Sequence, residues 1–448
     1  MTTSRLDPSP DSEVTITLDG ETITARPGEP LAAALMGAGV QVIGRSSKYH
    51  RVRGAPCGRG HCHQCLCRVD GQPNRQACQT PVSEGMVVER QNALGSAEND
   101  LLAATDWLFP RGLDHHAMFT GMPLIQPVVQ KVVRKLSGLG HLPGALPAAE
   151  GLPPLLDQGP EGVEVLVIGG GNAGIAAARA IQGAGARPLL VEALPELGGR
   201  LRSPLHEDEP RTTLPGLRVR TGTSAEWISG PGHPLEVVVR QAQRLQRILP
   251  RAVVLATGNY VGLSRFENND LPGLFDARWA AELVARWGVL PGRKVLLCAM
   301  DELTDRLRAL LEEAGASIVA TLPAEAALGR GETRVLGVNG RHWVEQVVLA
   351  TPEGEKRLAC DALIHSLPGH PCLELFHAAG GQPGWSDERS AFEARVAPDG
   401  STPRPGVFAA GSMTARMSPA EASESGARAG SAAAAFALSR PPEHDHAG

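Results

Sequence analysis

Four cysteines near the N-terminus place the strongest constraint on this chain. Cys57, Cys62, Cys65 and Cys78 have the spacing C-x4-C-x2-C-x12-C, so three thiols share one loop and the fourth stands apart. This is the ligand spacing of plant-type [2Fe–2S] sites. Two glycines between the first two cysteines allow the loop to turn backbone N–H groups toward an anionic cluster. We therefore predict that these four residues hold a [2Fe–2S] cluster, which transfers single electrons.

The cysteine-bearing loop has two other interpretations. His61 and His63 lie inside the loop, so a zinc site is one alternative, although zinc sites favour two short ligand pairs separated by a longer stretch. Inert thiols are the other. A buried free cysteine behaves as a small apolar residue. On that basis the remaining cysteines are expected to be structural: Cys67, Cys298, Cys360 and Cys372.

Size and composition bound the class of protein. Of the 448 residues, 42% are hydrophobic and 20% are charged, which is ordinary for two or three globular domains. The net charge of −5 gives no basic footprint for nucleic acid. No apolar run reaches the length of a membrane span, and residues 1–13 lack the apolar core of a secretory signal. We expect a cytoplasmic protein with no nucleic-acid partner, no integral membrane segment and no disulfide framework.

A strand, a glycine-rich turn and a helix follow one another in the middle of the chain. The apolar strand 163–168 leads into a G-x-G-x-x-G turn at 169–174 and a helix at 175–183, and a second strand at 189–191 is followed by Glu192. In such a unit the glycines make the turn, let the backbone approach a pyrophosphate and let the helix pack closely, while the acid accepts ribose hydroxyls. The pattern predicts a dinucleotide-binding Rossmann unit.

A second unit of this kind lacks the glycines. Residues 294–297 predict a strand and 303–314 a helix, but none of the three glycine positions between them is glycine. Met300 would obstruct a pyrophosphate, and Asp301 and Glu302 would repel it at the helix start. We expect a structural module here; retained NAD(P) binding is the weaker alternative.

Three further motifs resemble those of FAD-dependent flavoproteins of the pyridine-nucleotide-disulfide-reductase type. They are Leu197–Arg200, Val253–Gly258 and Val407–Ser412, and in the last of them Ser412 replaces the family's acid. A hydroxyl still donates or accepts a hydrogen bond, so the resemblance implies FAD. No cysteine lies between Cys78 and Cys298, which speaks against disulfide reduction. The glycine turn and the resemblance together assign FAD contacts to Gly169, Gly171, Asn172, Ala173, Gly174, Glu192, Gly198, Gly199, Arg200, Ala225, Ala256, Thr257, Gly258, Gly411 and Ser412.

The N-terminal region carries a more specific resemblance. Residues 43–54, together with Asn92 and the stretch 98–100, are similar to the α subunit of heterotetrameric sarcosine oxidase. The cysteine-bearing region resembles the ferredoxin-like subunit of hydrogen cyanide synthase and of opine and hydroxyproline dehydrogenase complexes. From Val163 onward the similarity is to their flavoprotein subunit. The resemblance implies a subunit of an FAD-dependent oxidoreductase that acts on CH–NH or CH–NH2 donors.

This family resemblance also implies partners. A separate flavoprotein subunit of the D-amino-acid-oxidase type would oxidise an amine or amino acid, and the present chain would relay electrons from FAD through [2Fe–2S] to a one-electron acceptor. No residue is tied by the sequence to general-base catalysis. The alternatives are a stand-alone NAD(P)H-dependent ferredoxin-type reductase and a non-catalytic carrier or assembly subunit.

The expected fold class is an α/β multidomain protein. An N-terminal β-grasp ferredoxin-like domain is followed by a flavoprotein with two Rossmann-like dinucleotide-binding domains. A helix at 128–136 and apolar segments at 107–110 and 118–123 are expected within a connector, near a partner-docking surface. The predicted boundaries are a ferredoxin-like domain at 14–95, the connector at 96–160, FAD-binding parts at 161–275 and 356–438, and an inserted degenerate NAD(P)-type domain at 276–355.

Overall fold

The computed structural model describes residues 4–6, 13–108, 128, 156–206, 216–242, 244–299, 303–387 and 389–439. The chain forms two compact units, each made of two stretches of sequence. Unit 1 contains Met1–Leu146 and Val261–Leu367, and unit 2 contains Pro147–Tyr260 and Pro368–Gly448. Most of the expected connector, including the predicted helix beyond residue 128 and the apolar segment at 118–123, lies outside the described residues. Within the described ranges, no helix is long and apolar enough to cross a membrane.

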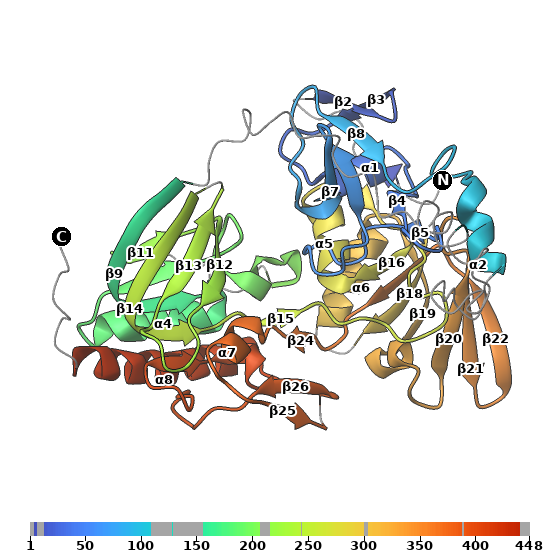
Figure 1. The fold of residues 1–448 in the computed structure, drawn as a ribbon. Helices are drawn as coiled ribbons and strands as arrows, with labels where there is room; N and C mark the ends of the chain where they lie inside the picture. Colours follow the sequence, from blue (N-terminus) through green and yellow to red (C-terminus); the bar gives the residue numbers. More distant parts are fainter. Residues whose placement is uncertain are drawn as a thin grey trace. The chain divides into compact units, whose positions relative to one another are not determined.

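The first half of unit 1 is a mixed five-stranded sheet with the order β3-β2-β8-β6-β7 (Figure 1). Its first hairpin turns at Asp19 and Gly20, both with positive φ, as a two-residue hairpin loop requires. Ile16 and Leu18 alternate with polar residues and face the core. The elements are β2 (Val14–Leu18), β3 (Glu21–Ala25), α1 (Leu31–Gly37), β4 (Gly44–Arg45), β5 (Val52–Arg53), β6 (Leu66–Val69), β7 (Gln72–Gln76), η1 (Ala77–Gln79), β8 (Val87–Arg90), η2 (Leu101–Ala103) and α2 (Ala104–Leu108).

The second half of unit 1, the inserted domain, contains a parallel four-stranded sheet with the order β16-β23-β18-β19. Val295 to Cys298 are fully buried, as in a strand covered on both faces. An antiparallel sheet β20-β21-β22 is added to it. The elements are β16 (Leu274–Asp276), α5 (Ala277–Ala285), β17 (Val289–Leu290), which pairs with β1 (Ser4–Arg5), β18 (Lys294–Ala299), α6 (Leu303–Glu313), β19 (Ser317–Pro323), η5 (Ala324–Leu328), β20 (Arg334–Asn339), β21 (Gln346–Thr351), β22 (Gly354–Ala359) and β23 (Ala362–His365).

Unit 2 is built on a seven-stranded sheet with the order β11-β10-β9-β14-β13-β12, in which β27 also pairs with β14. Strands β9, β10, β11, β14 and β27 run parallel, whereas β12 and β13 form an antiparallel meander with β14. The elements are β9 (Leu156–Ile168), α4 (Asn172–Gly183), β10 (Pro188–Val191), η3 (Gly199–Arg202), η4 (Pro204–His206), β11 (Arg218–Arg220), β12 (Thr223–Ile228), β13 (Val237–Gln241), β14 (Arg244–Leu255), β15 (Asn259–Tyr260), β24 (His370–Pro371), α7 (Glu374–Ala378), β25 (Pro383–Ser386), β26 (Ala391–Ala394), β27 (Val407–Ala409), η6 (Gly411–Met413) and α8 (Pro419–Leu438).

Helix α8 lies along helix α4 (Figure 1) at a distance that only glycine permits. A Cβ atom on Gly426 would lie 2.0 Å from the carbonyl oxygen of Ala173, and one on Gly430 would lie 2.4 Å from that of Ala177. A capping box formed by Ser418 begins α8. The two helices and the sheet bury one apolar layer between them. This packing fixes the position of α4, which directly follows the glycine-rich turn.

The described elements confirm the predicted fold class of a ferredoxin-like domain followed by Rossmann-like domains. Among the described residues, the predicted strands and helices are present, with shifts of a few residues at their ends. One difference is larger: β9 begins at Leu156, inside the stretch 96–160 that the sequence predicts to be a connector. Its added part pairs in parallel with the long strand β14, for example Glu161 with Ile248. Tertiary pairing has overridden the local propensity of Gly159 and Pro160.

Candidate functional site

The structure brings the four predicted cluster ligands together. Cys57, Cys62 and Cys65 lie in the loop between β5 and β6, and Cys78 comes from η1. Three of them are almost fully buried, with exposed fractions of 2%, 1% and 3% for Cys57, Cys65 and Cys78. Hydrogen bonds from the thiols of Cys62 and Cys78 lower the pKa of Cys57, and a hydrogen bond from Cys78 lowers the pKa of Cys65. The same hydrogen bonds, together with burial, raise the pKa of Cys62 and Cys78, so these two thiols are the donors and the four sulfur atoms lie close together.

Backbone and side-chain donors point at these sulfur atoms. The Arg59 N–H donates to Cys57 Sγ at 3.4 Å, and the Cys78 N–H donates to Cys65 Sγ at 3.4 Å. The Gln79 amide donates to Cys78 Sγ at 3.7 Å. Such donors favour negative charge on sulfur. The four thiols and their surroundings therefore fit an anionic [2Fe–2S] cluster.

The histidines of the loop are engaged elsewhere. The Val261 N–H donates to Nδ1 of His61 at 3.0 Å, and Nδ1 of His63 lies 2.7 Å from the amide nitrogen of Gln76. Burial lowers the pKa of His61. These contacts leave the four thiols as the coherent donor set and give no support to the zinc alternative.

The remaining cysteines have the surroundings of structural residues. Cys67 is fully buried, and its Sγ lies 3.6 Å from the carbonyl oxygen of Arg75. Burial raises the pKa to about 12 for Cys67, Cys298, Cys360 and Cys372.

In unit 2 the predicted FAD residues collect at the carboxyl edge of the parallel sheet. The strand ends Ile168, Val191, Leu255 and Ala409 are neighbours in register, so the segments that follow them emerge side by side. Ligands of open α/β sheets bind at this edge. The sequence motifs and the topology therefore define the same place.

The geometry of the turn explains its glycines. Gly169 has φ +106°, and a Cβ atom on it would lie 2.3 Å from the carbonyl oxygen of Ala256. A Cβ atom on Gly174 would lie 1.8 Å from the carbonyl oxygen of Gly169, whereas one on Gly171 would meet nothing within 4 Å. The first and third glycines are thus required by packing, and the second leaves space above the start of α4. This is the cradle that a pyrophosphate needs.

Glu192 is fixed by two backbone donors. Its Oε2 accepts from the Gly170 N–H at 2.6 Å and its Oε1 from the Leu194 N–H at 2.8 Å. Each carboxylate oxygen keeps a further acceptor site, so these bonds orient Glu192 without excluding a ribose hydroxyl.

The Gly-Gly motif closes over the turn. The Gly198 N–H donates to the Gly170 carbonyl at 2.8 Å, and a Cβ atom on Gly199 would lie 3.0 Å from Cα of Gly171. Arg200 donates to the carbonyl of Met417, just before α8. Gly198 has φ +117°, which favours glycine, and the close approach to the Gly171 backbone explains the glycine at position 199.

The motif Val407–Ser412 contacts the end of the motif Val253–Gly258. Thr257 Oγ1 donates to the carbonyl of Cys372 at 2.9 Å. A Cβ atom on Gly258 would lie 3.8 Å from the hydroxyl of Ser412, so these two residues are neighbours. Gly411 lies against Ala173 on α4. Of the remaining predicted contacts, Asn172 donates to the carbonyl of Pro419, and Ala225 packs on the core from β12.

Sequence analysis missed one residue of this region, Arg389. It lies in the turn between β25 and β26, and its side chain is 2% exposed. Its guanidinium donates to the carbonyl of Ser412 at 2.8 Å, to Asn259 Oδ1 at 3.1 Å and to the carbonyl of Gly369 at 3.3 Å. A buried arginine thus ties together three segments around the Gly258–Ser412 contact. In the sequence, the only signal for Arg389 is that an arginine stands in a short hairpin turn.

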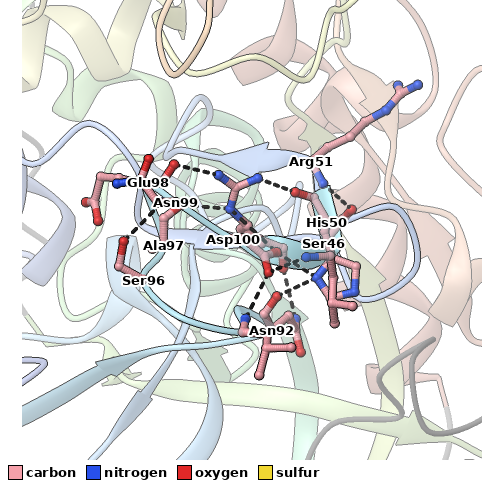
Figure 2. A network of polar contacts seen from close by, with 12 residues as sticks. Ser46, His50, Arg51, Asn92, Ser96, Ala97, Glu98, Asn99 and Asp100 are labelled. Carbon is pink, nitrogen blue, oxygen red and sulfur yellow. Dashed lines mark hydrogen bonds and ion pairs between the residues drawn. The ribbon is translucent and has the colours of Figure 1, made fainter. Parts of the chain in front are cut away.

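The residues behind the N-terminal resemblance form one buried polar network (Figure 2). His50 Nδ1 lies 2.8 Å from both Asp100 Oδ2 and the carbonyl of Asn92, and Arg45 donates to the carbonyls of Ala97 and His50. Buried charges require such partners. The network fastens the loop 46–51 to the segment 92–100 and so supports the ferredoxin-like sheet.

Comparisons with known proteins agree with this geometry. Residues 11–93 match the family described as a 2Fe-2S iron-sulfur cluster binding domain, and residues 167–242 match that of an NAD(P)-binding Rossmann-like domain. The HcnA subunit of hydrogen cyanide synthase from Pseudomonas aeruginosa (strain PAO1) is 38% identical over 87 residues, which are 19% of this chain and 83% of HcnA. The alpha subunit of sarcosine oxidase from Rhizobium meliloti (strain 1021) is 29% identical over 420 residues, which are 85% of this chain and 42% of that protein.

The chain belongs to the family of oxidoreductase subunits that includes HcnA and the sarcosine oxidase alpha subunit. Its N-terminal domain is the [2Fe–2S] domain of the family, and its cofactors are a [2Fe–2S] cluster and FAD. The chain spans less than half the length of the sarcosine oxidase subunit that it matches. L-proline dehydrogenase from P. horikoshii has the same fold, with a TM-score of 0.67 and 23% identity over 98% of this chain and 76% of that chain. The predicted family and cofactors are thereby confirmed.

Proposed function

We propose that this chain is the flavin and iron–sulfur electron-transfer subunit of an amine or amino-acid dehydrogenase or oxidase complex. The donors would be of the sarcosine, glycine, proline, hydroxyproline or opine type, oxidised at a CH–NH or CH–NH2 group. Two of the relatives are subunits of a sarcosine oxidase and of an opine oxidase, which supports this class. We place the complex in the cytoplasm, where thiols remain reduced.

One observation carries the proposal. A single chain joins a dinucleotide-binding fold to a four-thiol loop, while its second nucleotide-type turn, Cys298 to Leu303, contains no glycine. When bound, FAD accepts an electron pair and the cluster passes single electrons. Without a nicotinamide site, the electron pair must come from outside the chain. A D-amino-acid-oxidase-like flavoprotein subunit is the proposed source, and a one-electron acceptor is the proposed sink.

The residues of the chain would hold the two cofactors and carry no substrate chemistry. Gly171, with open space above it, would let the pyrophosphate approach the start of α4, and Glu192 would accept the ribose hydroxyls. Ser412 would offer a hydroxyl where relatives offer a carboxylate. The remaining FAD contacts proposed from the motifs are Gly169, Asn172, Ala173, Gly174, Gly198, Gly199, Arg200, Ala225, Ala256, Thr257, Gly258 and Gly411.

Reconstitution tests the proposal. The purified chain, loaded with both cofactors, is expected to reduce no dye with glycine, sarcosine, proline or hydroxyproline. Co-expression with a D-amino-acid-oxidase-like flavoprotein subunit should restore dye reduction with one of these donors. Full activity of the isolated chain would show that the substrate site lies within it and that the subunit role is wrong.

A further inference from the structure

The cluster loop is fastened to helix α5 of the inserted domain by two polar contacts. The carbonyl oxygen of Pro56 accepts a hydrogen bond from the N–H of Asp276, the N-cap of α5, at 2.8 Å. Arg59 donates to Glu282, also on α5, at 2.7 Å, and the two side chains are 14% and 11% exposed. The residues on either side of Cys57 are therefore both held by helix α5 or its cap.

Between these two contacts the loop lies on an indole ring. Gly58 has φ +61°, and a Cβ atom on it would lie 2.3 Å from Cδ2 of Trp279. Trp279 is 1% exposed and belongs to α5. Glycine at position 58 is thus required twice, by its backbone conformation and by the ring beneath it.

The indole of Trp279 also carries an unsatisfied donor. Its Nε1 is buried and has no hydrogen-bond partner among the described residues. Buried polar groups in native proteins are nearly always paired, so an orphan donor beside a ligand-binding loop indicates an acceptor supplied by the ligand. Sulfur atoms of a [2Fe–2S] site are acceptors of this kind, and such hydrogen bonds tune its reduction potential.

We propose that the inserted domain is the second half of the [2Fe–2S] site. Helix α5 supports the cluster loop through Asp276, Trp279 and Glu282, and the Trp279 N–H donates to a sulfur atom of the site. This role explains why a nucleotide-type domain that has lost its glycine turn is retained. The inference rests on the cluster cofactor alone and holds whichever donor and acceptor the chain uses.

Two physical consequences follow. A hydrogen bond to sulfur stabilises the more negative, reduced cluster, so the Trp279 N–H raises the reduction potential. The Arg59–Glu282 pair holds the loop closed, so it slows the loss of iron. A hydrogen bond between two charged groups is about tenfold stronger than one in which a partner is neutral.

The first test uses Trp279→Phe in the full chain, purified anaerobically with both cofactors. Phenylalanine keeps the ring under Gly58 and removes the N–H. The reduction potential, measured by a titration followed by electron paramagnetic resonance, is expected to fall. Trp343→Phe is the matched control: this tryptophan is buried in the same domain, but its Nε1 donates to the carbonyl of Asp361 and its variant should keep the potential. An unchanged potential in Trp279→Phe would overturn the assignment of the N–H.

The second test uses Glu282→Gln and measures iron release to a chelator. Release is expected to be about tenfold faster, because Arg59 loses its charged partner. Glu355→Gln, which breaks the exposed pair with Arg357, should release iron at the original rate. The far-ultraviolet circular dichroism and the midpoint of thermal unfolding serve as the measure of folding in every variant. If Glu282→Gln retains iron as well as the unmodified chain does, the inserted domain does not support the cluster; neither result depends on turnover with a substrate.

Discussion

Strand β9 leads into helix α4 through residues 169–171, and strand β18 leads into helix α6 through residues 300–302, so the two turns have the same length. The first turn is Gly-Gly-Gly and the second is Met-Asp-Glu. The second turn lies outside the described residues, but the strand before it and the helix after it are those of a nucleotide-binding unit. The two units therefore have the same strand and helix arrangement and differ in the sequence of the turn.

The difference teaches where ligand specificity resides in this fold. At the first turn a side chain on Gly174 would strike the carbonyl of Gly169, so backbone and helix are in direct contact. The second turn is known from its sequence, and we expect its bulky residue and two acids to disfavour a pyrophosphate, which needs bare backbone and positive potential. We therefore expect the strands and helices to supply a scaffold and the three turn residues to decide whether it takes a dinucleotide.

The largest effect is expected from Cys62→Ser, which removes a cluster ligand. Iron, acid-labile sulfide and the visible cluster absorption should be lost, while FAD remains bound, because every residue assigned to FAD belongs to unit 2 and Cys62 to unit 1. Cys67→Ala is the control, since Cys67 is outside the predicted ligand set and its buried thiol lies against the carbonyl of Arg75. Bound zinc without labile sulfide in the unmodified chain would contradict the cluster assignment.

Gly174→Ala tests the first turn. The new Cβ atom would lie 1.8 Å from the carbonyl oxygen of Gly169, and neither backbone segment can yield freely. We expect a loss of about 3 kcal/mol in the free energy of unfolding and loss of bound FAD. The free energy of unfolding is measured by urea denaturation, and the loss of FAD by the flavin released on gel filtration. Gly183→Ala in the same helix meets nothing within 4 Å and should be neutral or slightly stabilising. Retention of FAD by Gly174→Ala would refute the packing argument.

Arg389→Met should weaken FAD binding by about tenfold or more, because the Ser412 carbonyl and two neighbouring acceptors lose their donor. Arg389→Lys should recover part of the loss, since it keeps the charge but not the planar fork. The dissociation constant comes from quenching of flavin fluorescence. Arg395→Met on the same hairpin is the control, because the Arg395 side chain is 60% exposed. Equal affinities in the two methionine variants would remove Arg389 from the site.

The smallest effect is expected at the extension of β9, which the inserted domain's strand β18 lacks. Burial raises the pKa of Glu161, but hydrogen bonds from Arg218 and Arg220 bring it below its ordinary value. The carboxylate therefore stabilises the fold above about pH 4.3, and this contribution is lost as the pH falls through the lowered pKa. Glu161→Gln should cost about 1 kcal/mol of unfolding free energy at pH 7 and less in acid. A cost that does not change with pH would exclude the ion pairs as its cause.

The sequence was most informative where function depends on neighbours along the chain. The cysteine spacing, the glycine turn and Glu192 could be predicted because each is a local pattern followed by a strand end or a helix start. Arg389 could not, because its partner Asn259 is 130 residues away. Arg59 and Glu282, separated by 223 residues, show the same limit.

The start of β9 was mispredicted for a related reason. Gly159 and Pro160 are poor strand residues, and the strand exists because β14 offers a partner along its whole length. Local propensity therefore predicted a linker where long-range pairing makes a strand. Ser412 was found in sequence, but its position beside Gly258 follows only from the packing of two distant segments.

Anaerobic mixing of the FAD- and [2Fe–2S]-loaded chain with NADH or NADPH tests the central claim most directly. The claim is that only the first of the two nucleotide-type units binds a working redox cofactor. We predict negligible reduction of the flavin by either nucleotide, followed by complete reduction when dithionite is added. Bound but unreactive NAD would leave the claim intact, because a nucleotide can be a structural ligand. Rapid, stoichiometric bleaching of the flavin by NADH or NADPH would contradict it and would make the chain a nicotinamide-dependent reductase.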